Sequence, residues 1–316
     1  MRQKRASIGD LIGQRTAFVL VELAVAGALV LGSIFMVGWI WDRARGPVVS
    51  AAPSSVYNGY DPSGAYQQSA DWVAAQKAYQ TYVAANPQPK NVQVLTGWST
   101  AQIYGFMVSQ VSGGLKVNCQ YCHNINDFSS DEIPFKVKAR QMLLATGDLN
   151  GNFVSKLPAS VGGYQVTCAT CHNGQPKFET YPTKIQKTLP NDFKVPLDRD
   201  YPGGLIVTGR TDIGLESVQL NQYTMYHFNV SLGQGCTFCH NSRHFPSNEV
   251  VQKTHAITML QMARHIETTY VAPGGQIANG IMAGRSTSCW MCHQGARVPP
   301  GAALPGQVPP QLTTAP

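Results

Sequence analysis

Cys119-Gln120-Tyr121-Cys122-His123 carries two cysteines and a histidine in the spacing Cys-x-x-Cys-His, and this spacing occurs four times in the chain. The second, third and fourth motifs are Cys168-Ala169-Thr170-Cys171-His172, Cys236-Thr237-Phe238-Cys239-His240 and Cys289-Trp290-Met291-Cys292-His293. All eight cysteines of the chain lie in these motifs. The spacing is the attachment signature of a c-type haem, in which both thiols bind the porphyrin and the histidine binds the iron. The sequence therefore predicts four covalently attached haem c groups.

Two other uses of cysteine fit these motifs less well. A zinc site would combine two Cys-x-x-Cys pairs as four thiolates and would not require a histidine after every second cysteine. Disulfides would not require a constant spacing between the cysteines. The motifs therefore favour haem attachment over both alternatives.

Four porphyrins would also determine the fold class, because each is a large apolar group that replaces side chains in a core. A chain of 316 residues has room for one or two domains, and the porphyrins favour a single haem-organised domain. Charged residues are only 13% of the chain, which also contains 30 glycines and 20 prolines. This composition suits short helices joined by long loops. We predict a mainly α fold with extensive loops, of the multihaem cytochrome c type.

Residues 17–41 (AFVLVELAVAGALVLGSIFMVGWIW) form a 25-residue apolar stretch in which Glu22 is the one charged residue. At about 1.5 Å per residue, a helix of this length crosses a hydrocarbon core of roughly 30 Å. The basic residues that precede it place residues 1–16 in the cytoplasm; they are Arg2, Lys4, Arg5 and Arg15. We therefore predict a single transmembrane helix in the cell membrane, with the haem domain on the periplasmic side.

A cleaved signal peptide is the main alternative to this anchor. Against it, the apolar stretch is longer than a usual signal core, and Trp39 and Trp41 stand where a small-residue cleavage site belongs. A lipid anchor on an N-terminal cysteine is excluded, because the first cysteine is Cys119.

The rest of the chain divides where its composition changes. Residues 42–70 are predicted to be a linker, and residues 71–297 a tetrahaem cytochrome domain. Residues 298–316 contain six prolines, so this tail is expected to be extended or disordered, without a role in the fold. Within the domain we predict helices over residues 71–85, with Asp71 as its cap, and over 100–111, 136–144 and 254–268.

The net charge of +7 does not indicate a nucleic-acid-binding protein. Residues 1–45 contribute +3 of this charge and residues 46–316 contribute +4. Four haem groups would add eight propionates, which brings the reduced haem domain to about −4. No nucleic-acid partner is therefore expected.

The haem domain contains an internal repeat, which is apparent when each haem histidine is taken as the origin. Asn124 and Asn241 directly follow the histidines of the first and third motifs, and Phe128 and Phe245 both lie five residues after them. The second and fourth motifs follow 49 and 53 residues later. We therefore predict a duplicated two-haem module, spanning about residues 95–180 and 213–297, with approximate two-fold symmetry.

Four methionines recur at matched distances from the haem histidines. Met107 lies 16 residues before His123, and Met225 lies 15 residues before His240. Met142 and Met259 each lie 19 residues after the same two histidines. A methionine in an amphipathic helix is usually a core residue, but matched offsets with one methionine per motif favour sixth ligands to iron. We predict Met107, Met142, Met225 and Met259 as these ligands.

Two classes of function compete. In an electron-transfer subunit, two protein ligands occupy every iron; an enzyme, such as a membrane-anchored tetrahaem quinol dehydrogenase, needs an open iron or a quinol pocket. Four methionine ligands leave no iron open, and a thioether raises the haem potential relative to a second imidazole, which suits donation to a strong oxidant. The four further histidines do not recur in the repeat; they are His227, His244, His255 and His265. Electron transfer is therefore preferred.

Residues 70–297 resemble the tetrahaem cytochrome subunit of photosynthetic reaction centres. The resemblance rests on the four motifs, on Met107, Met142 and Met225, and on the stretches KVKARQMLLATGDLNGNF after the first motif and MARHIETTY after the third. It implies a row of four haems that re-reduces the oxidised bacteriochlorophyll special pair in the reaction-centre core subunits. It also implies a soluble electron donor, with the first motif farthest from the special pair and the third nearest to it.

The sequence departs from the family pattern in two places. Many members have a lipidated N-terminal cysteine, whereas the predicted helix here is similar to that of filamentous anoxygenic phototrophs, whose soluble donor is often a blue-copper protein rather than a cytochrome c. Several members also ligate the fourth haem with a histidine of the first module, where this chain has Lys156. We therefore predict His293 and Met259 for the fourth haem. The rivals are Met262, Met282, Lys156, His255 and His265.

Overall fold

The computed structural model describes residues 69–158, 163–177, 189–190, 193–198, 212–271, 286–304 and 306–314, together with scattered positions between residues 13 and 36. The chain forms two compact units, Met1–Val48 and Val49–Pro316. The described positions of the first unit are helical, and their side chains are exposed. Among the described residues, no helix is both long enough and apolar enough to span a bilayer. The predicted span over 17–41 and linker over 42–70 fall largely outside the described residues and stay predictions.

The second unit consists of helices and loops, and its described part contains isolated bridges but no strand, so the predicted mainly α architecture is confirmed. The longer helices are α3 (Ala70–Ala85), α4 (Thr100–Phe106), α6 (Pro134–Asn152), α9 (Leu215–Leu232) and α10 (Val251–His265). The short α-helices are α5 (Gly113–Leu115), α7 (Cys168–His172) and α11 (Trp290–His293). The π-helices are η2 (Met107–Ser112) and η8 (Ile266–Val271), and the 3₁₀ turns are η3 (Cys119–Tyr121), η4 (Val154–Lys156), η7 (Cys236–Phe238) and η9 (Pro310–Leu312).

The four helices predicted within residues 71–297 all occur, and capping side chains explain where α3 and α4 begin. Ser69 caps α3 by accepting a hydrogen bond from the amide of Trp72 at 3.2 Å, so the predicted cap at Asp71 is wrong by two residues. Asp71 lies instead in the first turn, where a negative charge favours the helix dipole. Ser99 and Gln102 form a capping box at the start of α4.

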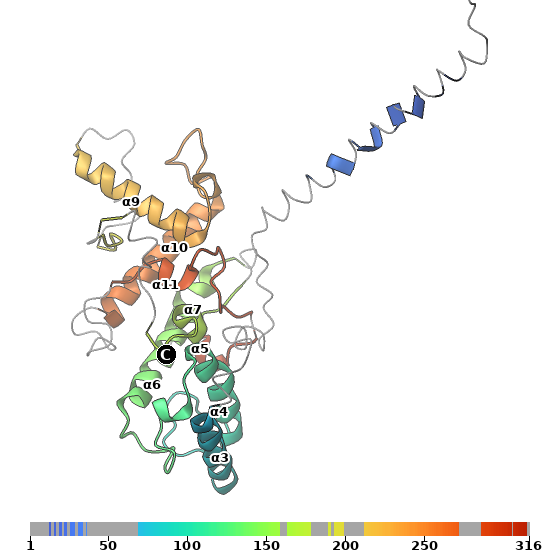
Figure 1. The fold of residues 1–316 in the computed structure, drawn as a ribbon. Coiled ribbons are helices and arrows are strands. Elements are labelled where there is room, and N and C mark those ends of the chain that lie inside the picture. Colours follow the sequence, from blue (N-terminus) through green and yellow to red (C-terminus); the bar gives the residue numbers. More distant parts are fainter. Residues whose placement is uncertain are drawn as a thin grey trace, which may run out of the picture. The chain divides into compact units, whose positions relative to one another are not determined.

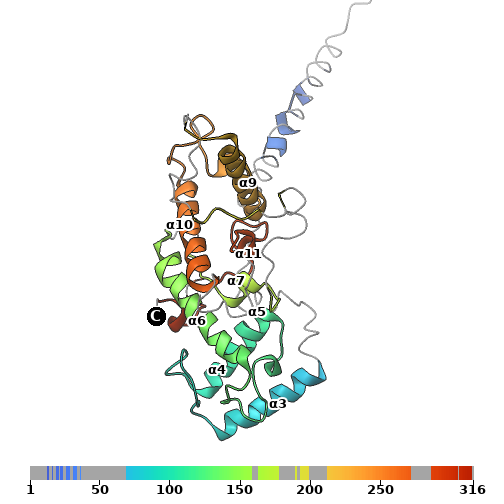
Figure 2. The ribbon, with the colours of Figure 1, turned by 90° about the vertical axis from the view of Figure 1, so that its left-hand side faces the viewer.

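The three short α-helices and the longer helix α9 form a continuous path through the second unit. Helix α5 contacts α7, α7 contacts α11, and α11 contacts α9, as both ribbon views show (Figure 1 and Figure 2). The approach of α5 to α7 is close because Gly114 has no side chain, and a Cβ there would lie 3.0 Å from the amide nitrogen of Ala169. The second and fourth motifs, which are α7 and α11, therefore lie side by side.

A buried carboxylate joins α6 to the end of α10 and to η8. Asp148 Oδ2 accepts hydrogen bonds from the Tyr270 hydroxyl at 2.6 Å and from His265 Nε2 at 2.5 Å. Asp148 Oδ1 accepts a further one from the Asn152 amide at 2.6 Å. Burial raises the pKa of Asp148, but the hydrogen bonds from Tyr270, His265 and Asn152 outweigh it and hold the pKa below its usual value. The carboxylate is therefore charged at neutral pH.

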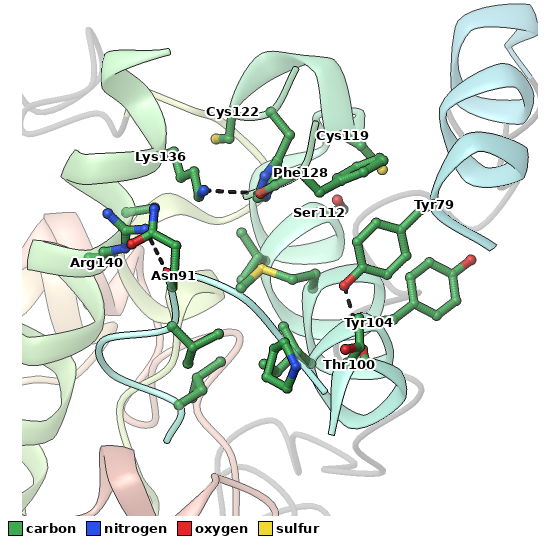
Figure 3. Close-up of a pocket in the computed structure, with 18 of the residues that line it drawn as sticks. Tyr79, Asn91, Thr100, Tyr104, Ser112, Cys119, Cys122, Phe128, Lys136 and Arg140 are labelled. Atoms are coloured by element: carbon green, nitrogen blue, oxygen red, sulfur yellow. Dashed lines mark hydrogen bonds between the residues drawn. The ribbon is translucent and has the colours of Figure 1, made fainter. Parts of the chain in front are cut away.

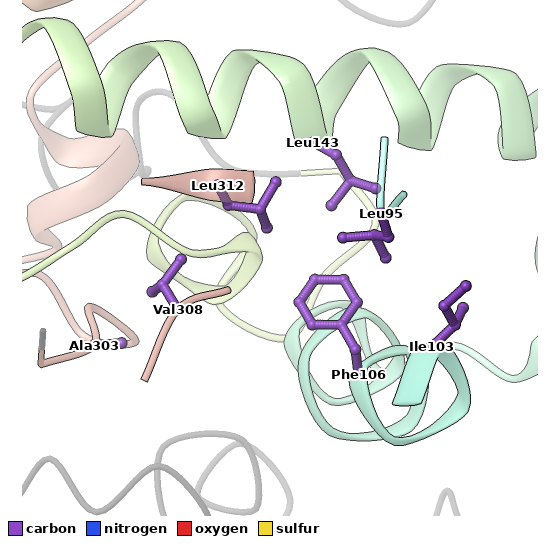
Figure 4. Close-up of a cluster of buried hydrophobic side chains, with 7 residues drawn as sticks. All are labelled: Leu95, Ile103, Phe106, Leu143, Ala303, Val308 and Leu312. Carbon is purple, nitrogen blue, oxygen red and sulfur yellow. The ribbon is translucent and has the colours of Figure 1, made fainter. Parts of the chain in front are cut away.

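The C-terminal segment is part of the core, so the expectation of a tail without a role in the fold is wrong. Val308 and Leu312 are 4% and 2% exposed and pack with Leu95, Phe106 and Leu143 (Figure 4). The segment is also hydrogen-bonded to the first module: the Gln165 and Ala303 backbones form an antiparallel bridge, and Asn150 Nδ2 donates to the Leu312 carbonyl at 2.8 Å. Its low charge is the physical reason, because an apolar segment gains stability by burial even where prolines prevent helix formation.

We expect Leu312→Ala to destabilise the haem-loaded protein by about 2–4 kcal/mol, because it removes a fully buried side chain and leaves a cavity. Guanidinium unfolding followed by circular dichroism measures this. The control is Leu215→Ala, since Leu215 is 73% exposed and its loss should change stability by less than about 0.5 kcal/mol. Equal stability of the two variants would contradict the core position of the C-terminal segment.

We expect Asp148→Asn to lower the free energy of unfolding at pH 7 by about 1–3 kcal/mol, since it weakens hydrogen bonds to a buried charge. The folded pKa of Asp148 is depressed, so its stabilisation is present above the unfolded pKa of about 3.9 and is lost as pH falls through the folded value. The difference between wild type and Asp148→Asn should therefore shrink below about pH 4. The exposed Asp198→Asn is the control, and a difference that is constant with pH would rule out this linkage.

Candidate haem-binding sites

The first motif opens onto an apolar cavity between α4, η2 and α6 (Figure 3). The empty space in and before this cavity, with open solvent included, is about 1090 Å³. Cys119, Cys122 and His123 lie on its wall, and Met107 lies on the same wall. The structure thus places Met107 and the first motif on one cavity, and their pairing at an iron stays a prediction.

Local structure positions the ligands of this first cavity. Helix α4 changes at Met107 into the π-helix η2, and π segments within helices are frequent at functional sites. Residues Cys119–Tyr121 form the turn η3, whose carbonyl at Cys119 accepts from the amide of His123 at 2.9 Å. Both cysteines and the histidine are thereby held on one tight turn.

The first-motif histidine is neutral at physiological pH, as a metal ligand must be. Burial, together with the positive charge of Lys136, lowers the pKa of His123 to about 4. Its buried Nδ1 makes no hydrogen bond of good geometry, although the Phe128 carbonyl is near enough to oppose the effect of burial on the pKa. The Phe128 ring lies 5.5 Å from the imidazole, centroid to centroid.

The second motif lines a separate apolar cavity together with Met142 of α6. Its empty space is about 1380 Å³, and Cys168, Cys171 and His172 all lie on its wall. Thr167 and Thr170 form a capping box that begins α7, and His172 Nδ1 donates to the Gln175 carbonyl at 3.0 Å. That bond leaves Nε2 with a lone pair for a metal. The structure thus places Met142 and the second motif on one cavity, and their pairing at an iron stays a prediction.

The first and second cavities adjoin each other. Their linings share residues from η2, the first motif and α6, namely Met107, Val111, Cys122, Ala139 and Leu143. Groups bound in the two cavities would therefore be separated by a single layer of side chains.

The third motif has the same local structure as the first. Residues Cys236–Phe238 form η7, and the amide of His240 donates to the Cys236 carbonyl at 3.0 Å. His240 Nδ1 donates to the Phe245 carbonyl at 2.9 Å, and the two rings stack at 5.0 Å. Met225 is half-buried in α9, and its pairing with the third motif stays a prediction.

The fourth motif forms α11 and is held by α9. His293 Nδ1 donates to the Ala296 carbonyl at 3.0 Å, and His227 Nε2 accepts from the amide of Cys289 at 3.1 Å. Burial lowers the pKa of His227 to about 4, so its ring is neutral and can accept. The fourth motif contacts the second directly, since Cys171 Sγ and Cys292 Sγ are 3.3 Å apart.

The rivals for the fourth ligand occupy distinct positions. Both ring nitrogens of His265 have partners, since Nε2 bonds Asp148 at 2.5 Å and Nδ1 meets the Thr269 hydroxyl at 3.2 Å. Met262 packs in the central apolar cluster beside Cys292, as a core residue does. Met259 is half-buried in α10, and its pairing with the fourth motif stays a prediction. Met282 lies outside the described residues.

Contacts around the first and third motifs match at positions 117 residues apart. Asn124 Nδ2 donates to Glu132 at 2.7 Å, and Asn241 Nδ2 donates to Glu249 at 2.6 Å. Helices α6 and α10 also begin 117 residues apart. A further hydrogen bond is equivalent before the second and fourth motifs, where the donor lies two residues before the first cysteine. The amide of Val166 donates to Asn150, and the amide of Thr287 donates to Glu267, each at 2.7 Å.

Three supporting residues were not singled out from the sequence. Lys136 and Lys253 donate to the backbone of the loops after the first and third motifs, and His227 holds the start of the fourth. The two lysines lie at the same offset of 13 from their haem histidines, which is the signal that could have found them. His227 has no such signal, because its role depends on a contact 62 residues away.

The two cavities fit the group that the motifs predict. Each is apolar, with two thiols and an imidazole on one turn and a thioether on the wall, which is the donor set of a His/Met haem c. Burial raises the pKa of Cys122 to about 11 and that of Cys168 to about 12. These surroundings disfavour the thiolates that a zinc site would use and suit uncharged thioether sulfur.

The sequence matches known proteins over most of its length. A family model described as the photosynthetic reaction centre cytochrome C subunit matches residues 56–195 and 216–309. Cytochrome c-554 of Chloroflexus aurantiacus is 31% identical over 317 aligned positions, covering 75% of this chain and 76% of that protein. Two proteins named photosynthetic reaction center cytochrome c subunit also match. The one from Thermochromatium tepidum is 29% identical and covers 66% of this chain and 60% of that protein. The one from Rubrivivax gelatinosus is 27% identical and covers 73% of this chain and 72% of that protein. The chain belongs to the family of photosynthetic reaction centre cytochrome c subunits, which are electron carriers with covalently bound haem c.

Proposed function

We propose that this protein re-reduces the photo-oxidised bacteriochlorophyll special pair of a reaction centre through four covalently bound haem c groups. The observation that carries the proposal is the convergence of Met107 with the first motif and of Met142 with the second, each pair on the wall of its own apolar cavity. A thioether and an imidazole on every iron leave no position for a substrate. This favours electron transfer over the quinol dehydrogenase alternative.

The proposed ligand pairs are Met107 with His123, Met142 with His172, Met225 with His240 and Met259 with His293. Two findings support Met259 for the fourth haem. Met259 lies 117 residues after Met142, which is the offset that relates the contacts around the first and third motifs. In addition, His265 is held by Asp148 and Thr269 through both ring nitrogens, so it would have to lose a bond to reach an iron.

The repeat supports a duplicated two-haem module, with the symmetry axis between α7 and α11. Asn173 and Gln294, which follow the second and fourth haem histidines, both have left-handed backbones, and their side chains hydrogen-bond to each other. Asp148 and His265 are 117 residues apart and also contact each other. Residues related by a two-fold axis meet one another only near that axis, so these pairs are expected there.

The membrane and partner assignments rest on the family and on the sequence. We propose that residues 17–41 anchor the chain in the cell membrane, with the haem domain on the periplasmic side against the reaction-centre core subunits. A soluble donor, either a blue-copper protein or a cytochrome c, would deliver electrons at the first motif. The third motif would then lie nearest the special pair.

Flash absorption on native membranes tests the function. A flash that oxidises the special pair should be followed by oxidation of haem in this subunit and by recovery of the special pair. Removal of the subunit should slow that recovery, while quinol addition in the dark should not reduce its haems. Haem reduction by quinol without any flash-induced oxidation would favour the dehydrogenase.

The Met107 assignment predicts the effect of its removal. Met107→Ala should remove one quarter of the low-spin iron signal from the electron paramagnetic resonance spectrum, because one of the four irons loses its thioether ligand. Met262→Ala is the matched control, since Met262 packs in the core and should leave all four signals unchanged. A Met107→Ala protein with four intact signals would show that Met107 is not a ligand.

A further inference from the structure

Two lysines close the loops that follow the first and third motifs. Lys253 Nζ donates to the carbonyls of Phe245, Pro246 and Ser247 at 3.2, 2.6 and 3.0 Å. At the position 117 residues earlier, Lys136 Nζ donates to the carbonyls of Phe128, Ser129 and Ser130 at 3.0, 2.8 and 2.7 Å (Figure 3). Both lysines lie in the first turn of their helices, α10 and α6.

The hydrogen bonds identify the charge of both side chains. A carbonyl oxygen only accepts, so three carbonyls around one nitrogen require three N–H donors. Only the protonated ammonium group has three, because neutral lysine has two. Each loop therefore encloses a positive charge.

In the third motif this charge acts on the haem histidine through a shared atom. The carbonyl oxygen of Phe245 accepts both from Lys253 Nζ at 3.2 Å and from His240 Nδ1 at 2.9 Å. An acceptor bonded to Nδ1 increases the electron density of a ligating imidazole. A cation on the same oxygen withdraws that density, so the imidazole is a weaker donor to its metal.

The two lysines differ in how their charges are balanced. Lys136 Nζ lies 3.1 Å from the Asp131 carboxylate, which also binds Arg140 at 2.8 Å. The residue equivalent to Asp131 in the second module is Asn248. Among the residues that the structure describes, no carboxylate forms an ion pair with Lys253, and the neighbouring Glu249 instead bonds Asn241 at 2.6 Å. The positive charge at Lys253 is thus less compensated than that at Lys136.

We propose that Lys253 is a positioning residue that raises the reduction potential of the third-motif haem, through the Phe245 carbonyl and His240. The inference rests on the proposed function, in which His240 is an iron ligand. Withdrawing density from the imidazole favours ferrous over ferric iron, and an uncompensated positive charge acts in the same direction. Lys136 has the weaker effect on the first-motif haem, because Asp131 neutralises it and His123 Nδ1 does not share the Phe128 carbonyl in good geometry.

Spectroelectrochemical titration of the full-length, haem-loaded protein tests this with Lys253→Met. We expect the equilibrium constant for one-electron reduction of a single haem to fall about tenfold, a downward shift of about 59 mV, while the other three potentials stay unchanged. Lys253→Arg keeps the charge and should restore most of the wild-type value. Lys136→Met is the matched control, and its largest shift should be less than half as great.

The outcomes separate this inference from a loss of folding and from failure of the proposed function. If Lys253→Met does not load four haems, Lys253→Gln is used instead, because it keeps a polar group that can bond the loop. One of the four haem potentials of Lys253→Gln should then fall, as expected for Lys253→Met. Unchanged potentials, or equal shifts in Lys253→Met and Lys136→Met, would overturn the inference. Failure of the proposed function would appear already in the wild type, as fewer than four haems or no flash-induced oxidation.

Discussion

The hydrogen bond from Nδ1 of a haem histidine to a nearby carbonyl is the interaction on which the rest of the site depends. It is present at His172, His240 and His293, at 3.0, 2.9 and 3.0 Å. It directs the second ring nitrogen away from the loop, and it holds the ring neutral on that side. Once this direction is set, a second ligand would have to come from another element that lines the cavity, and Met142 of α6 lines the cavity of His172.

Much of the site could be predicted because its information is local. The motif spacing, the capping box at Ser99 and Gln102, and the matched offsets of the methionines all concern residues close in sequence. The C-terminal segment could not be predicted, because Leu312 is buried against residues about 170 to 220 positions away and proline-rich composition is shared by disordered and packed chains. The role of His227 also depends on a distant partner, the amide of Cys289, and no rule of periodicity identifies such a pair.

The two halves of the domain are similar in backbone and different in charge. The loops after the first and third motifs keep the same asparagine, glutamate and lysine contacts, so the fold of each loop is maintained by equivalent hydrogen bonds. At the positions equivalent to Asp131 and Arg140 the chain has Asn248 and Ile257, so the two ion pairs of Asp131 are absent there while those contacts are kept. The two loops thus share their hydrogen bonds, and the residues around them give each motif a different charge environment.

The position of the C-terminal segment has a consequence for the order of assembly. Val308 and Leu312 pack against Ile103, Phe106 and Leu143, and two of these, Ile103 and Leu143, also line the first cavity. Chains are synthesised from the N-terminus, and distant contacts form late. Ile103 and Leu143 in the wall of the first cavity therefore lack these packing partners until Val308 and Leu312 have been synthesised. The cavity of the first motif is therefore completed by residues that are synthesised after all four motifs.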